Sequence, residues 1–113
     1  MTGGPLVVLS TAPSAEEGLR IGRRLVEEHL AASVNVLPGA RSVFFWDGRV
    51  QEADEVVLVI KTESERYAAL ERRVLALHSY SVPAVLALPV TSGSAAYTAW
   101  LRESVASVEG GEG

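Results

Sequence analysis

His78 and Tyr80 are the residues of this sequence whose side chains best suit a metal ion. An imidazole binds divalent transition metals when a carboxylate or carbonyl holds its second nitrogen, and Tyr80 could orient such a ring. The alternative is that His78 caps the C-terminus of a helix, where a cation suits the helix dipole, and that Tyr80 packs at a subunit boundary. A single loop histidine favours the alternative, because zinc-type sites gather three or four ligands.

A short acidic run supplies the carboxylates for such a site. Glu52 and Asp54 share one face of a predicted strand, and Glu55 points to the other face. Carboxylates on one face could hold a hard cation weakly. We take Glu55, with His78, as the candidate metal ligands. The alternative is a solvated strand edge in which Glu55 is buried and paired with Lys61 or with an arginine of a neighbouring copy.

Lys61 is the only lysine of the chain. It ends an apolar strand just before a predicted helix start, where Thr62 and Glu65 have the spacing of a capping box. Backbone N–H groups at a helix N-terminus, together with one ammonium, can gather an anion, although Lys61 also suits a plain surface strand end. The residues that we assign to a candidate ligand cleft are Lys61, Tyr80, Pro83 and Trp46.

Aromatic side chains occur near a predicted hairpin tip and on the last predicted helix. Large aromatic rings are typical anchors of protein interfaces, so we expect intersubunit contacts here rather than a cofactor site. The residues predicted to lie at such an interface are Phe44, Tyr97 and Trp100, and Phe45 and Trp46 lie beside Phe44 in the sequence.

Hydrophobic periodicity and turn residues predict the elements that position these side chains. Asp47-Gly48 between two apolar runs is typical of a β-hairpin, Pro38-Gly39 indicates a bulge, and Ser14 with Glu17 has the spacing of a capping box. The predicted order is strand, helix, strand, strand, helix, strand and a last helix, over residues 6–11, 14–30, 34–46, 49–61, 62–77, 84–88 and 93–105. This is the split βαβ order of α+β ferredoxin-like folds, with an antiparallel sheet and helices on one side.

The predicted strands are apolar on both faces, although helices can cover only one face of a two-layer fold. The runs 6–9, 56–60 and 84–88 show this pattern. Leaving about five large apolar side chains in water would forgo on the order of 8–15 kcal/mol. We therefore expect self-association; the alternative is that the last helix closes the sheet.

The composition indicates one domain over residues 1–113, with a flexible lead-in at 1–5 and a flexible tail at 109–113. The net charge of -4 argues against nucleic acid or an anionic membrane as partner, because both require a basic surface. The chain has no cysteine, which excludes disulfides, thiolate metal sites and cysteine nucleophiles. We find no targeting or membrane-spanning segment, and we expect a cytoplasmic protein.

Several segments, in this order, resemble the CutA divalent-cation tolerance family over most of the chain. They are Ser10-Thr11-Ala12-Pro13-Ser14, Leu30-Ala31-Ala32-Ser33-Val34-Asn35, Pro38-Gly39, Phe45-Trp46-Asp47-Gly48, Glu55, Lys61-Thr62, His78-Ser79-Tyr80-Ser81-Val82-Pro83 and Tyr97-Thr98-Ala99-Trp100-Leu101. The resemblance implies a ferredoxin-like subunit similar to the PII signalling proteins, a compact homotrimer and an association with tolerance of copper and other divalent cations.

The sequence departs from the family pattern at four positions. Many members have a cysteine at the position of Ser33, and some also have one at the position of Ser10. The serines of this chain remove these soft ligands for Cu(I). Ser79 replaces the proline after the loop histidine, and Ala84 replaces a glutamate after Val-Pro. A function that depends on that glutamate in relatives would be lost or moved here.

We therefore expect a trimeric protein that binds or responds to copper or another divalent cation, weakly, in clefts between subunits. A PII-like small-ligand signalling module, or an interaction scaffold with an unidentified protein partner, is the alternative. We do not expect an enzyme, because the sequence offers no assembled Ser/His/Asp set and no acylphosphatase-type anion loop. Exposed aromatics on a basic sheet, as in RNA-binding modules of this topology, are not predicted either.

Overall fold

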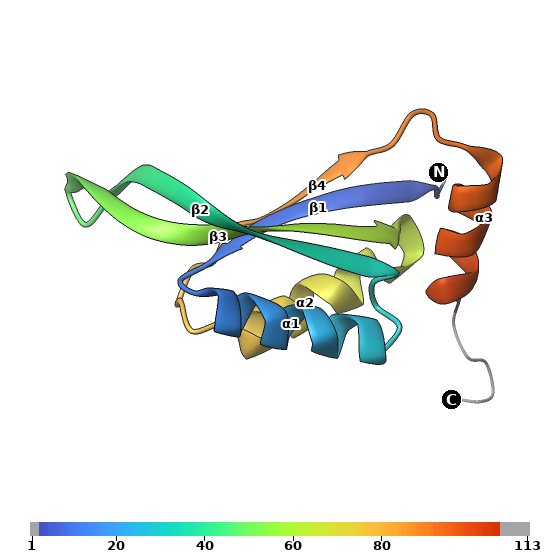
Figure 1. The fold of residues 1–113 in the computed structure, drawn as a ribbon, viewed down its shortest axis with the longest axis horizontal. Helices are drawn as coiled ribbons and strands as arrows, with labels where there is room; N and C mark the ends of the chain where they lie inside the picture. The colour runs from blue at the N-terminus through green and yellow to red at the C-terminus, as the bar shows by residue number, and fades with distance from the viewer. Residues whose placement is uncertain (1–2, 107–113) are drawn as a thin grey trace.

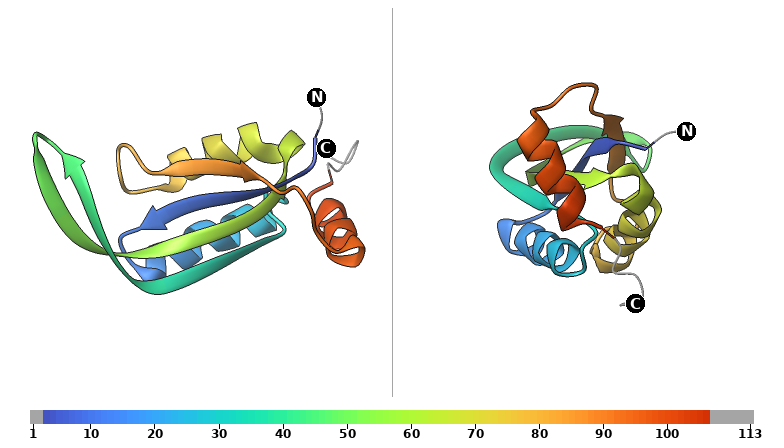
Figure 2. Two further views of the ribbon diagram at one scale, coloured as in Figure 1. Left: turned by 90° about the horizontal axis from the view of Figure 1, so that it is seen from above. Right: turned by 90° about the vertical axis from the view of Figure 1, so that its right-hand side faces the viewer.

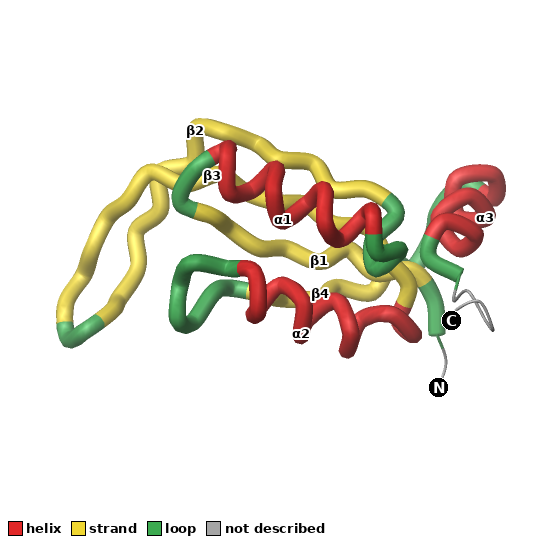
Figure 3. Tube along the Cα trace, turned by 90° about the horizontal axis from the view of Figure 1, so that it is seen from below, coloured by secondary structure: helices red, strands yellow, loops and turns green. Residues whose placement is uncertain are grey.

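The computed structural model of the protein describes residues 3–106. Four antiparallel strands form one sheet in the order β2-β3-β1-β4, and α1 and α2 lie side by side across one face of it (Figures 1 and 3). This confirms the predicted ferredoxin-like α+β order with a C-terminal helix. The elements are β1 (Pro5–Ala12), α1 (Ala15–Glu27), β2 (Ser33–Trp46), β3 (Arg49–Glu63), a 3-10 turn (Ser64–Arg66), α2 (Tyr67–Leu77), β4 (Val85–Pro89) and α3 (Ala95–Ser104).

The first helix lies close to the sheet because two glycines face it. A Cβ atom added at Gly18 would lie 3.0 Å from a methyl group of Val56, and one at Gly22 would lie 3.1 Å from a methyl group of Val34. The close approach predicted at Gly22 is confirmed. The core between the helices and the sheet includes the buried residues Val8, Ala12, Ile21, Leu25, Leu58, Ile60, Leu70 and Val74, and partly buried apolar side chains pack around them.

The two predicted capping boxes differ from what the structure shows. The Ser14 hydroxyl accepts from the Glu17 N–H (3.1 Å), but the Glu17 carboxylate bonds Ser79 rather than returning to the cap. Thr62 caps nothing: it is a buried residue of β3, and its hydroxyl donates to the Leu30 carbonyl (2.7 Å). Thr62 is therefore too far inside the strand to start a helix, and α2 begins at Tyr67.

The chain becomes ordered earlier than predicted. Pro5 is already in β1, and the Gly4 carbonyl accepts from both the N–H and the hydroxyl of Ser64. The rest of the predicted flexible ends, residues 1–2 and 109–113, lies outside the described residues. No helix in the described part of the chain has the length and apolar character needed to cross a membrane.

The sheet face opposite α1 and α2 is apolar and uncovered. Strand alternation and register place Val59, Leu9 and Leu86 on it side by side. Leu86 is 66% exposed and Leu88, further along β4, is 48% exposed. Helix α3 does not close this face: it crosses the end of the sheet (Figure 2), where its buried Leu101, and Val105 directly after it, pack with Ala32. The predicted two-faced apolar strands are therefore confirmed, and closure by the last helix is wrong.

Strands β2 and β3 form a hairpin that extends well beyond the rest of the sheet (Figure 1). Its turn is Asp47-Gly48, where both residues have positive φ (56° and 77°), as a tight hairpin turn requires. Near the tip Phe45 is 71% exposed. The predicted bulge is also confirmed: β2 advances from Leu37 to Ala40 while β3 advances only from Val57 to Glu55.

Candidate functional site

A buried carboxylate lies where the hairpin leaves the sheet. Glu55 of β3 is only 9% exposed. One of its oxygens accepts from the Ser42 hydroxyl of β2 (2.6 Å), and the other accepts from the Tyr80 hydroxyl (2.7 Å). Burial of Tyr80, and then its bond to the charged carboxylate, raise the pKa of Tyr80 to about 12. The two hydroxyl donors therefore hold the Glu55 carboxylate in one orientation.

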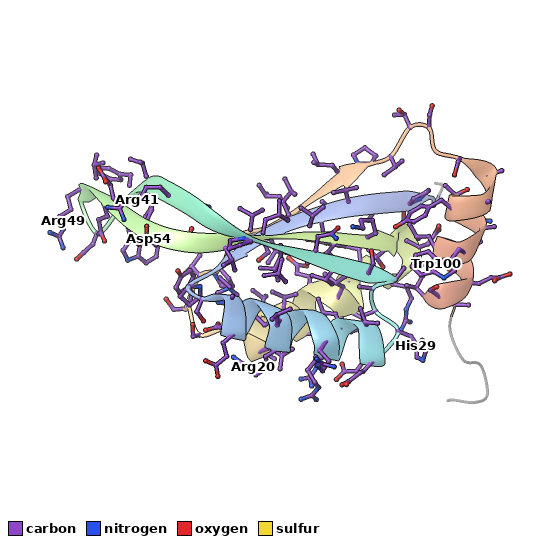
Figure 4. The ribbon with its side chains drawn as sticks, in the orientation of Figure 1. Arg20, His29, Arg41, Arg49, Asp54 and Trp100 are labelled. Atoms are coloured by element: carbon purple, nitrogen blue, oxygen red, sulfur yellow. The ribbon has the colours of Figure 1, made fainter. Side chains whose placement is uncertain are left out.

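The bulge in β2 decides which residues share a face with Glu55. Because β2 contains one extra residue, Ala40 lies opposite Glu55, and Ser42 is on the same face. Without that residue the alternation would bring Arg41 to this face instead. Arg41 in fact lies on the other face, where it pairs with Asp54 (2.8 Å) and Glu52 (3.3 Å; Figure 4). The bulge thus keeps the nearest arginine of the hairpin away from the buried carboxylate.

The register also shows where the acidic run points. Glu52 and Asp54 do share a face and Glu55 does point away from them, as predicted. Glu55 is buried, but the predicted pairing with Lys61 is wrong. The Lys61 ammonium donates to the side-chain oxygen of Asn35 instead. Because α2 begins only at Tyr67, Lys61 is not beside a helix N-terminus that could gather an anion.

His78 positions Tyr80. Its Nδ1 accepts from the Tyr80 backbone N–H (3.0 Å), so the ring proton must be on Nε2, which donates to the Thr11 carbonyl (2.7 Å). The two rings are in contact, with centroids 4.7 Å apart. Glu17 lies 3.5 Å from Nδ1, but this is no ion pair, because Nδ1 carries no proton in this arrangement. A metal ion at His78 would have to displace one of the two ring bonds.

Glu17 ties the loop after α2 to α1. Its carboxylate accepts from the N–H and the hydroxyl of Ser79 (both 2.8 Å). Partial burial opposes ionisation, but the two Ser79 bonds outweigh it and lower the pKa of Glu17 below its ordinary value. The loop that carries Tyr80 is therefore anchored at two points, by Glu17 and by Thr11.

A pocket of about 520 Å³ opens beside the Glu55 carboxylate, between the base of the hairpin and the loop before β4. Of the residues predicted to act, Glu55, Tyr80, Trp46 and Phe44 meet here; Lys61, Pro83 and His78 are not in its wall. We call it the Glu55 pocket; its walls are formed by Thr11, Ser42, Phe44, Phe45, Trp46, Glu55, Tyr80, Ser81, Val82 and Ala84.

The other predicted interface aromatics lie at the opposite end of the molecule. Tyr97 and Trp100 of α3 are in contact, with ring centroids 5.4 Å apart, and both are roughly half exposed. His29 lies near α3 as well (Figure 4), and its Nδ1 bonds the Ser104 carbonyl (3.1 Å). Tyr97 and Trp100 are therefore available for an intersubunit contact, which stays a prediction.

Comparison with known proteins agrees with this architecture. The model of the family described as CutA1 divalent ion tolerance protein matches residues 6–104. The chain belongs to the CutA1 family. The divalent-cation tolerance protein CutA of Thermus thermophilus is 47% identical over 98 residues, which is 87% of this chain and 95% of that protein. Its solved structure superimposes with a TM-score of 0.87 at 46% identity, over 88% of this chain and 97% of that chain.

A second CutA relative is longer. The chloroplastic CutA protein of Arabidopsis thaliana is 44% identical over 99 residues, 88% of this chain. The chain spans only 54% of that relative's length.

Two of the positions at which this CutA sequence departs from the family pattern carry buried hydroxyls. Ser10 and Ser33 each have a buried Oγ without a hydrogen-bond partner among the described residues. A third, Ala84, lines the Glu55 pocket and adds no charge to it. Glu55 is the one carboxylate in its wall.

Sequence reasoning missed Ser42, Thr11 and Glu17. Ser42 precedes Phe44 and Trp46 at strand spacing, so the hairpin pattern could have placed it on their face. Thr11 takes part through its backbone carbonyl, which no sequence pattern reveals. In the described part of the chain no three side chains of the metal-binding types come together.

Proposed function

We propose that this CutA protein is a non-catalytic, cation-binding module that works as a homotrimer, with the Glu55 pocket as its binding site. The observation that carries the proposal is the environment of Glu55. Its carboxylate is buried and bonded only to the hydroxyls of Ser42 and Tyr80, and it makes no ion pair among the described residues. A buried charge without a counter-ion favours a positively charged ligand.

The size of the Coulomb term supports this choice. Two opposite unit charges about 4 Å apart attract by ~4 kcal/mol at the effective dielectric constant near a protein surface. Part of that is offset by desolvation of the ligand. The names of the relatives refer to divalent cations, and copper(II), bound weakly, is the cation that we propose to test. One carboxylate and two hydroxyls make a poor ligand set, so tight metal binding would need ligands from another copy.

The proposed assembly rests on two surfaces. The open face of the sheet exposes Leu86 and Leu88, and the protruding hairpin exposes Phe45. Exposed apolar surface of this kind on a small protein marks an association site. Because the Glu55 pocket lies at the edge of that face, a neighbouring copy would bound it. That the number of copies is three is implied by the resemblance to CutA and PII proteins.

The absence of catalysis is part of the proposal. His78 is the one histidine near the pocket, and both of its ring nitrogens are engaged in holding the loop. A general base must be free to take a proton from a substrate.

The PII-like alternative, a small organic ligand rather than a metal, is favoured by one observation: the pocket is lined mostly by aromatic and aliphatic side chains.

Calorimetric titration with Cu(II), followed by electron paramagnetic resonance, tests the proposal. His29 is an exposed imidazole outside the pocket, so a His29→Ala background removes adventitious copper there. In that background we expect weak binding that is lost in Glu55→Gln and that shows no nitrogen hyperfine coupling. Copper binding that survives Glu55→Gln unchanged would contradict the proposal, and a nitrogen hyperfine coupling that disappears in His78→Ala would move the site to His78.

A further inference from the structure

Three consecutive aromatic residues form one wall of the Glu55 pocket. Phe44, Phe45 and Trp46 all line it, although alternate residues of a strand normally point to opposite faces. Here the strands bend away from the sheet as they enter the hairpin (Figure 2). Val82 and Ala84 add aliphatic surface on the loop side. The wall is therefore apolar and aromatic, and the carboxylate of Glu55 is the charged group beside it.

That combination suits one kind of cation. The faces of tryptophan and phenylalanine rings attract cations through their quadrupoles, and aromatic walls are the usual way in which proteins hold quaternary ammonium groups. A methylated or alkyl ammonium carries its charge on an apolar body. Its charge can lie beside Glu55 while its carbon atoms contact Phe44 and Trp46, so both parts of the pocket are satisfied at once.

A bare metal ion fits the same pocket poorly. Both Glu55 oxygens already accept a hydroxyl, and the wall contains no second carboxylate. Calcium takes 6–8 oxygen ligands and magnesium keeps a near-octahedral shell, so either ion would retain most of its water. The imidazole of His78, which a transition metal would prefer, is bonded at both nitrogens. Aromatic side chains offer no ligand atoms that could replace the water molecules of a hydrated metal ion.

The dimensions agree with an organic ligand. Pockets that bind small molecules are typically ~300–1,000 Å³. At about 520 Å³, the Glu55 pocket has room for a ligand of several carbon atoms and is far larger than a metal ion requires.

We propose that the Glu55 pocket binds a small organic ammonium ion, with its charge at the Glu55 carboxylate and its apolar part against Phe44, Phe45 and Trp46. This rests on the proposed function, in which the pocket is a cation site, and specifies the chemical class of the cation. The bulge turns the Arg41 guanidinium to the opposite face, where it pairs with Asp54, so it does not compete with a ligand for the Glu55 carboxylate.

Choline and 3,3-dimethylbutan-1-ol are a matched pair for the test, because they have the same shape and differ in one positive charge. Calorimetry on the full chain in its native assembly should show choline binding at least ~10-fold more tightly than the neutral alcohol, as about 1.4 kcal/mol of charge recognition requires. Glu55→Gln should abolish that preference. Trp46→Leu should weaken choline binding, and Arg24→Gln, on the outer face of α1, should leave it unchanged.

Equal binding of the two compounds, or no binding of choline, overturns the inference; so does a choline preference that neither Glu55→Gln nor Trp46→Leu reduces. If Glu55→Gln fails to fold, Trp46→Leu still decides, because Trp46 is half exposed. Cu(II) titrated into the same samples separates the two proposals. Glu55-dependent copper binding without choline binding leaves the cation site standing and removes the ammonium class, whereas binding of neither removes both.

Discussion

The hydrogen bond from Tyr80 to Glu55 makes the stability of the protein depend on one hydroxyl. In Tyr80→Phe the ring and its contact with His78 remain, but one oxygen of the buried Glu55 carboxylate loses its donor. A hydrogen bond to a charged group contributes ~1.5–3 kcal/mol. Tyr80 is only half buried, so we expect the lower end, about 1.5 kcal/mol. For a chain of this size that corresponds to a fall in Tm of roughly 6–12 °C, at ~4–8 °C per kcal/mol.

Burial of Tyr80, together with the same bond, predicts that stability depends on alkaline pH. The pKa of Tyr80 is raised from 10.0 to about 12, so the folded protein keeps the phenolic proton where the unfolded chain releases it. The contribution is therefore complete below pH 10 and is lost as the pH rises from 10 to 12. Because solvent screens a half-buried group, we expect a loss of ~1 kcal/mol over this interval.

Urea unfolding at one fixed protein concentration, at neutral pH and at several points of that alkaline interval, measures both effects. Tyr97→Phe is the matched control, because among the described residues the Tyr97 hydroxyl makes no hydrogen bond. Tyr80→Phe should lower the midpoint and flatten the alkaline dependence, and Tyr97→Phe should do neither. A Tyr80→Phe protein as stable as the parent, with the same alkaline slope, would refute the role assigned to this bond.

Three further predictions concern residues outside the pocket. Ser10→Ala should stabilise the protein by about 1 kcal/mol in urea unfolding, because the buried Ser10 hydroxyl has no partner and its desolvation is not compensated; a destabilised variant would show that the hydroxyl is bonded. Gly18→Ala should destabilise by ~1–3 kcal/mol, since the added methyl would lie 3.0 Å from Val56, and a gain in Tm would show that the helix can move away. The pKa of Glu17 is lowered, so its bonds to Ser79 stabilise the fold fully above pH 4.5, the ordinary pKa, and this stabilisation is lost as the pH falls below that value. Glu17→Gln should therefore weaken the dependence of the urea midpoint on acid pH. An unchanged acid dependence would contradict this.

Local patterns predicted the elements and their faces well. The Asp47-Gly48 turn, the Pro38-Gly39 bulge and the close approach at Gly22 each follow from the backbone demands of glycine. The two-sided apolar strands predicted an uncovered face, since strand alternation alone decides which side chains point there. These features depend on a few neighbouring residues, which is why the sequence reveals them.

The polar contacts around Glu55 could not be predicted in the same way. Tyr80 and Glu55 are 25 residues apart and come from a loop and a strand. Ser42 reaches Glu55 only because the bulge shifts the register by one residue, and a register shift of one exchanges the two faces. Pro38-Gly39 indicated a bulge but not its exact register. The choice between Ser42 and Arg41 as the neighbour of Glu55 was therefore not determined by the sequence pattern.

The capping error at Thr62 has a related cause. Thr62 and Glu65 have the right spacing, but β3 continues to Glu63 because Thr62 is paired in the sheet and bonded to the Leu30 carbonyl. Tertiary contacts thus prevailed over a local motif. The position of α3, across the end of the sheet, depends likewise on the distant Ala32.

We propose that copies of this chain cover the open sheet face and complete the Glu55 pocket. Sedimentation equilibrium at micromolar concentration tests it most directly. We predict a single species of three times the 12.0 kDa chain mass, and a shift toward smaller species in Leu86→Glu, which places a charge on that face. A folded particle of 12.0 kDa in the parent protein would contradict the claim.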